Sequence, residues 1–186
     1  MPLDLEHGTL EKVGSGGRLT FVRDLKHPRQ KVWRSITEPA QLRVWFPTTI
    51  DGERQAGAPL KFVFPFPDAP VLEGKMLVFD PPSTIEFEWG DEDVLRITLE
   101  DVDGGTRLTL IDTFDEYGKA ARDAGGWHAC LDRLTYEIDG VEWPYGDNGR
   151  WKMVTPWYLK NFPKEATTAP IPDFHPDAED ANAMRD

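Results

Sequence analysis

Two hydrophobic periods divide this chain. Between residues 18 and 114 apolar and polar residues mostly alternate, which is the period of half-buried β-strands. Between residues 119 and 140 the spacing is that of one helical face, and the apolar positions are Trp127, Leu131, Leu134 and Ile138. Gly140 follows this stripe, where a left-handed helix cap forms easily. A long apolar helix face needs a wide apolar partner, so we predict a curved antiparallel sheet wrapped around this helix.

The earlier part of the chain predicts strands interrupted by two short helices. Residues 18–25 form the first strand, and its buried face carries Leu19, Phe21, Arg23 and Leu25. Helices follow over 28–37 and 39–45, with Pro28 at a position that a first helical turn tolerates. Further strands are expected over 60–66, 71–80, 85–89, 95–100 and 107–114. Short hairpin connections require antiparallel pairing, so the order predicts an α+β fold.

Composition changes mark three parts of the chain. Residues 1–17 are polar and end in glycines, which predicts a flexible N-terminal arm, with room for a short strand at its start. Residues 18–140 form the folded domain. Residues 141–186 form a C-terminal extension that is first aromatic and then rich in Pro and Asp. The aromatic stretch 141–163 is expected to pack back on the domain or on a second subunit, and the remainder is expected to be loose.

Charge and cysteine content narrow the classes of partner. The 186 residues carry a net charge of −12, which argues against nucleic acid and anionic membrane as partners. Cys130 is the one cysteine, so no intrachain disulfide forms, which fits a cytoplasmic location. The sequence has no apolar run long enough to insert into a membrane and no signal-peptide pattern at its start.

No set of residues forms a recognisable catalytic or metal-binding motif. His128 and Cys130 lie two residues apart on the predicted helix and point in nearly opposite directions, so they cannot act as a dyad. Glu86 and Glu88 alternate with Phe87 and Trp89, which places the two carboxylates on the solvated face. The four histidines are scattered without ligand spacing. We therefore predict no catalytic residues, no metal and no cofactor.

Several short motifs together resemble a known family. The first group lies in the first strand and the two short helices: Arg23, Pro28, Val32, Trp33, Thr37, Pro39, Leu42, Trp45 and Phe46. The second group is spread over the later strands and the long helix: Gly57, Gly74, Trp89, Gly104-Gly105-Thr106, Leu108-Thr109-Leu110, Gly126, Trp127, Leu131, Leu134 and Gly140. Across residues 18–140 the chain resembles the activator of heat-shock-protein-90 ATPase homologues, within the START-like or SRPBCC superfamily.

This resemblance implies a helix-grip fold with a cavity between the sheet and the long helix. Relatives in the superfamily bind lipids, polyketides or hormones. The residues expected to line the cavity are Trp45 at its rim and Phe62, Phe64, Met76, Phe87, Trp89, Asp112, Trp127, Leu131 and Leu134. Residue types alone favour a core that these apolar side chains simply fill, and the resemblance is what favours a cavity.

Two charged residues interrupt apolar strand faces. Asp112 interrupts the face of Leu108, Leu110 and Phe114, and Arg23 interrupts that of the first strand. A buried lone carboxylate must be paired or protonated. The first and last strands of a helix-grip sheet are neighbours, so we expect Arg23 and Asp112 to form a polar pair inside the grip, either structural or as a ligand anchor.

The expected function is therefore a cytoplasmic domain that binds a small hydrophobic or amphipathic ligand, such as a lipid. One alternative is a cyclase- or aromatase-like enzyme acting on a hydrophobic substrate. Another is a chaperone-associated interaction domain that uses the sheet face or the aromatic extension. The sequence is compatible with a monomer or with a homodimer formed through residues 141–163.

Overall fold

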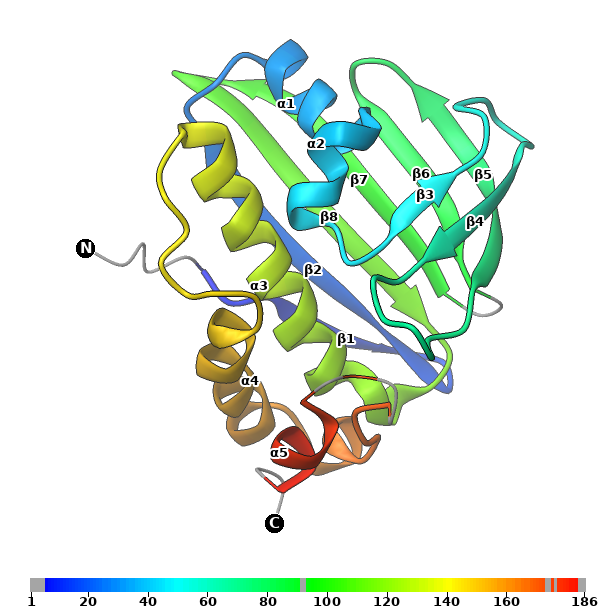
Figure 1. Cartoon of the computed structure of the whole chain (residues 1–186), viewed down its shortest axis with the longest axis vertical. Coiled ribbons are helices and arrows are strands. Elements are labelled where there is room, and N and C mark those ends of the chain that lie inside the picture. Colours follow the sequence, from blue (N-terminus) through cyan, green and yellow to red (C-terminus); the bar gives the residue numbers. More distant parts are fainter. Residues whose placement is uncertain (1–5, 91–92, 173–174, 176, 184–186) are drawn as a thin grey trace.

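The computed structural model describes residues 6–90, 93–172, 175 and 177–183. Within these residues, one antiparallel sheet has the strand order β1-β2-β8-β7-β6-β5-β4-β3. The strands are β1 Thr9–Val13, β2 Gly16–Leu25, β3 Thr49–Asp51, β4 Pro59–Val63, β5 Leu72–Asp80, β6 Thr84–Trp89, β7 Asp93–Val102 and β8 Gly105–Phe114. The sheet is open and curved, and Figure 1 shows it wrapping around one long helix.

That helix crosses the inner face of the sheet, and two short helices cover one end of the same face (Figure 1). The helices are α1 Arg29–Thr37, α2 Pro39–Trp45, α3 Ala120–Asp139, α4 Gly149–Asn161 and α5 Ala178–Ala183, with 3-10 turns η1 Tyr117–Lys119 and η2 Lys164–Thr167. The predicted α+β helix-grip fold is confirmed. Within the described residues, no helix combines the length and the apolar character needed to cross a membrane.

Helix α3 follows the sequence pattern closely. Its four predicted stripe residues are all buried against the sheet and the short helices. Burial of each large apolar side chain contributes about 1.5–3 kcal/mol. The helix ends at Gly140, which has φ +67° and ψ +28° and supplies the left-handed cap. The amphipathic helix is therefore the element around which the sheet curves.

The N-terminal arm is more ordered than the sequence suggested. Residues 9–13 form β1, which pairs with β2 from Thr9 opposite Thr20 to Val13 opposite Gly16. Gly14, with φ +59°, allows the tight turn between the two strands. The expected flexible arm is thus an edge strand over these residues, while residues 1–5 lie outside the described part.

The aromatic extension packs back on its own domain. Helix α4 lies along the outer side of α3 (Figure 1), and Val154 and Tyr158 are buried there. Beyond η2, the Asn182 side chain bonds the backbone of Ile171 in both directions, at 2.9 and 3.4 Å. The later extension, expected to be loose, is therefore tied down where it is described. Residues 173, 174, 176 and 184–186 lie outside the description.

Helices α3 and α4 approach each other most closely at Gly125. A Cβ atom at Gly125 would lie 2.2 Å from Thr155 Oγ1 and 3.1 Å from Thr155 Cβ. The next residue, Gly126, faces away, and a Cβ there would meet no heavy atom within 4 Å. The helix therefore has no room for a side chain at Gly125 but has room for one at Gly126.

We predict that Gly125→Ala and Gly126→Ala change stability in opposite directions. The added methyl at Gly125 separates α3 from α4, and such overpacking costs about 1–3 kcal/mol. At Gly126 the same change gains helix propensity of up to about 1 kcal/mol without a clash. Urea unfolding of the two variants measures both effects. Equal stability of the two variants would contradict the described docking of α4.

Candidate functional site

The inner face of the grip is lined with aromatic rings. Phe62 and Phe87 are buried with ring centroids 5.4 Å apart, and Phe62 lies 4.9 Å from the half-buried Trp89. Trp89 in turn lies 5.7 Å from Trp127 on α3 and 6.2 Å from Phe64. The other expected lining residues in the same core are Met76, Leu131 and Leu134. The structure therefore brings the apolar residues of the predicted site together.

Trp45 does not line the site as expected, whereas its neighbour Phe46 does. Trp45, expected at the rim, is 3% exposed, and its indole N–H donates to the Ser35 carbonyl oxygen at 2.9 Å. It therefore holds the two short helices together. Phe46 was not among the predicted lining residues, yet its ring lies 5.4 Å from Trp89 and 5.6 Å from Trp127. The chain leaves α2 at this residue, which turns the side chain inward.

Asp112 is the polar group on this inner face. It is 1% exposed, and its Oδ2 accepts a hydrogen bond of 2.8 Å from Trp127 Nε1. Its Oδ1 is buried and has no hydrogen-bond partner among the described residues. Burial raises the pKa of Asp112 to about 8, and repulsion from Asp123 and Asp93 acts in the same direction. The carboxyl group is therefore neutral at pH 7.

Asp112 belongs to a cluster that sequence reasoning missed. Carboxylate oxygens of Asp93, Asp112 and Asp123 lie within 4.8 Å of one another. Lys119 Nζ bonds Asp93 and lies 3.6 Å from Asp123. Arg122 Nε donates to Asp123 at 2.7 Å. The three carboxylates come from β7, β8 and α3, so no spacing in the sequence could reveal the cluster.

Arg23 and Asp112 do not form the expected pair. Their strands are neighbours, as predicted, but the register places Asp112 opposite Leu19 and Arg23 opposite Leu108. The two side chains are thus separated along the strands by four residues. Arg23 instead lies 3.3 Å from Asp132 on α3. The register between β2 and β8 therefore decides which residues pair, and the sequence does not specify that register.

Asp132 is the centre of a second buried network, on the α4 side of α3. Besides Arg23, it accepts a 2.6 Å bond from Arg150 and lies 3.3 Å from His128 Nε2. Burial alone would raise the pKa of Asp132, but these three donors outweigh burial and hold the pKa below its ordinary value. Asp132 is therefore ionised, in contrast to Asp112.

The network extends through His128 to the N-terminal segment. His128 Nδ1 lies 2.8 Å from the Tyr158 hydroxyl, which also accepts a 2.9 Å bond from the Gly8 backbone N–H. His128 therefore serves packing between elements. Burial raises the pKa of the Cys130 thiol to about 12, so Cys130 is a poor nucleophile.

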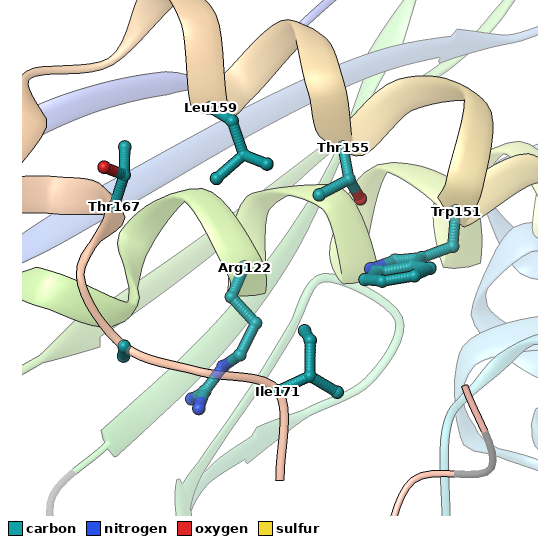
Figure 2. Close-up of a pocket in the computed structure, with 7 residues that line it drawn as sticks. Arg122, Trp151, Thr155, Leu159, Thr167 and Ile171 are labelled. Carbon is teal, nitrogen blue, oxygen red and sulfur yellow. The ribbon is translucent and has the colours of Figure 1, made fainter. Parts of the chain in front are cut away.

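A small hollow lies between α3, α4 and the end of the extension. Figure 2 shows Arg122, Trp151, Thr155, Leu159 and Ile171 around it. Arg122 Nη1 donates to the Pro170 carbonyl oxygen at 3.1 Å across its edge. The volume is about 10 Å³, about the room that one water molecule needs. This hollow is therefore a packing feature, and the inner face of the grip is the better candidate site.

The amino-acid sequence matches a known family over residues 26–139, which is more than half of the chain. That family is described as Activator of Hsp90 ATPase homolog 1-like protein. The chain belongs to this family. No curated protein matches it.

Solved structures with the same fold come from several bacteria. A conserved protein of unknown function from Enterococcus faecalis is 18% identical, with a TM-score of 0.68 over 82% of this chain and 88% of that one. CalU16 from Micromonospora echinospora is 20% identical, with a TM-score of 0.56 over 70% and 83%. A protein from Mesorhizobium loti is 20% identical, with a TM-score of 0.59 over 68% and 99%. At these identities the likeness concerns the fold.

The two buried networks differ in how much of each lies inside the region that matches the family. Asp112, Trp127 and the carboxylate cluster lie inside the region shared with Activator of Hsp90 ATPase homolog 1-like proteins. Arg150 and Tyr158 lie beyond its end at residue 139 and reach back to α3. The extension therefore completes a polar network on a helix that belongs to the family domain.

The neutral state of Asp112 predicts a specific dependence of stability on pH. An unfolded aspartate releases its proton near pH 4, whereas folded Asp112 keeps it up to about pH 8. Between these values the folded state binds more protons, so this contribution to stability falls as pH rises. We expect the free energy of unfolding of the wild type to fall, relative to that of Asp112→Asn, by up to about 1.4 kcal/mol for each unit by which the pH rises. Urea unfolding across the range measures the difference, and a constant difference would contradict the raised pKa.

The second network predicts a large cost for neutralising Asp132. Asp132→Asn leaves the buried Arg23 without its counter-charge, and breaking such a pair costs about 3–5 kcal/mol. Asp139→Asn on the same helix is the matched control: its carboxylate is 39% exposed and pairs with His27. That change should cost about 1 kcal/mol or less. Equal costs in denaturant unfolding would count against Asp132 as the centre of the network.

Proposed function

We propose that this protein is a small-molecule-binding helix-grip domain whose ligand lies between the inner face of the sheet and α3. The ligand has an apolar body that packs among the aromatic rings. A polar group of the ligand bonds Asp112. The cytoplasmic location stays a prediction from the sequence, as does a homodimer formed through the aromatic extension.

The free oxygen of Asp112 is the observation that carries this proposal. A buried polar atom without a partner costs about 1–3 kcal/mol. Asp112 Oδ1 is such an atom among the described residues, although the other oxygen of the same group is bonded to Trp127. Protein cores rarely leave such groups unsatisfied unless a ligand, water or function accounts for them. A ligand group that bonds Oδ1 would remove this cost.

The surroundings of Asp112 suit a ligand with a flat apolar body. Trp127 contacts the rings of Phe46 and Trp89 at centroid distances of 5.6 and 5.7 Å. Trp89 and Phe64 are only half buried, so this end of the aromatic cluster reaches the surface. Ligand sites are mostly apolar with a few placed polar groups, which is the composition found here. Family membership supports the same reading in general terms.

A complete enzyme is less well supported. Cyclisation or proton transfer needs acidic and basic groups that converge on the substrate. On the inner face, the carboxylate cluster is one group of titratable side chains that a substrate could meet. The other buried network, around Asp132, lies on the opposite side of α3 and does not converge on the same place. Binding therefore accounts for the arrangement with fewer assumptions.

The proposal predicts that the protein carries a small molecule when it is purified gently from its own host. Native mass spectrometry should show wild type heavier than its polypeptide, and solvent extraction should release the ligand. Asp112→Asn should lower the occupied fraction because Asn cannot replace a carboxyl in either protonation state. Asp103→Asn in the exposed β7–β8 turn is the matched control and should keep full occupancy.

Two results would contradict the proposal. One is a wild-type protein that carries no added mass from any gentle preparation and shows no change in tryptophan fluorescence with apolar probes. The other is a bound molecule whose occupancy is the same in wild type and Asp112→Asn.

A further inference from the structure

We propose that the ligand of this site carries a single positive charge, as in an apolar amine, and that its ammonium group binds Asp112 Oδ1 beside Asp93 and Asp123. This inference rests on the proposed function and narrows the chemical class of the ligand. It stands on the charge balance of the cluster, the free buried oxygen and the rings around it.

The charge balance of the cluster lacks one positive charge. Asp93, Asp112 and Asp123 bring three carboxyl groups within 4.8 Å of one another. Lys119 and Arg122 bring two cations, both within 4 Å of these carboxylates. With all three carboxyl groups ionised, one negative charge remains. A proton or one monovalent cation can neutralise it, whereas a divalent ion would leave an excess of positive charge.

The distribution of contacts shows where that charge would sit. Lys119 bonds Asp93 and lies near Asp123, and Arg122 bonds Asp123. Neither of these cations bonds Asp112, whose only described hydrogen bond comes from the neutral indole N–H of Trp127. Asp112 is 1% exposed, and its Oδ1 has no partner among the described residues. The uncompensated acceptor is therefore Asp112.

The rings beside Asp112 favour a cation with an apolar body. Trp127 bonds the carboxyl directly, and Phe46 and Trp89 lie within 6 Å of Trp127. Trp127 turns its N–H edge towards Asp112, so the rings offer an apolar surface to the body of the ligand and leave its charge to the carboxylates. The side chains of Lys119 and Asp123 are 12% and 16% exposed, so the cluster also reaches solvent. An amine can therefore enter with its charge at the cluster and its body among the rings.

Proton release distinguishes a cationic ligand from a neutral one. The groups around Asp112 are Asp93 from β7, Lys119 from η1, and Asp123 and Trp127 from α3. Burial and the two acidic neighbours raise the pKa of Asp112, so the free protein holds a proton there at neutral pH. A cationic ligand displaces that proton, and its affinity must rise with pH until Asp112 is ionised without it. A neutral hydrogen-bond acceptor would instead lose affinity over the same range.

The test compares phenethylamine with phenethyl alcohol, which share one apolar body, by isothermal titration calorimetry. We expect the amine to bind at least about tenfold more tightly than the alcohol at about pH 8. Its affinity should rise about tenfold between about pH 6 and about pH 7. Asp112→Asn should abolish both effects, and the exposed Asp103→Asn should keep both.

Failure of this inference can be told from failure of the proposed function. Equal affinities for the two probes, an amine affinity that falls as pH rises, or no binding of the amine at all would each overturn the inference. If a neutral molecule co-purifies with wild type and depends on Asp112, the binding function stands while the amine is excluded. If the amine preference persists in Asp112→Asn, the charge is bound elsewhere and the assignment to Asp112 is wrong.

Discussion

The structure depends on the burial of helix α3 on two opposite sides. Its apolar stripe is buried against the curved sheet, as any helix-grip domain requires, and its other side is buried by α4 from the extension. The middle turns keep a partly exposed face at Gly126, Ala129 and Arg133, while the sides that face the sheet and α4 are shielded from solvent. Each polar group near it must be neutralised by a partner, by a proton or by a ligand. That requirement explains why both unusual polar clusters of the chain lie beside this one helix.

Two buried aspartates meet the requirement in different ways. Asp132 receives bonds or close contacts from Arg23, Arg150 and His128, and these donors keep it ionised despite burial. Asp112 receives one bond from a neutral indole, and burial with acidic neighbours keeps it protonated. The number and charge of the donors therefore decide the state of each carboxyl. The first network attaches the extension through charged partners, although Arg23 Nε and His128 Nε2 have no hydrogen-bond partner among the described residues. The second leaves Asp112 Oδ1 without a partner and without a bonded cation.

The sequence predicted the elements well because each depends on local periodicity. The stripe from Trp127 to Ile138, the cap at Gly140 and strands β2 and β5 to β8 are local signals, and the structure has them close to where they were expected. Strand β4 ends at Val63 and not at residue 66, and β3 was not predicted. The pairing of Arg23 with Asp112 was wrong because strand register is a tertiary property. The cluster of Asp93, Asp112 and Asp123 was missed because it joins three elements. Helix α4 did leave a signal at Trp151, Val154 and Tyr158, but Pro156 inside the helix obscured it.

The most direct test of this account is the titration of the Asp112 side-chain carboxyl, followed by carbon NMR in the ligand-free protein and assigned with Asp112→Asn. The account predicts that this resonance titrates with a midpoint near pH 8, because the buried carboxyl lacks a cationic partner. A midpoint near pH 4, the ordinary value of an aspartate, would show that Asp112 is already compensated. That result would contradict the uncompensated carboxyl on which the proposed ligand site rests.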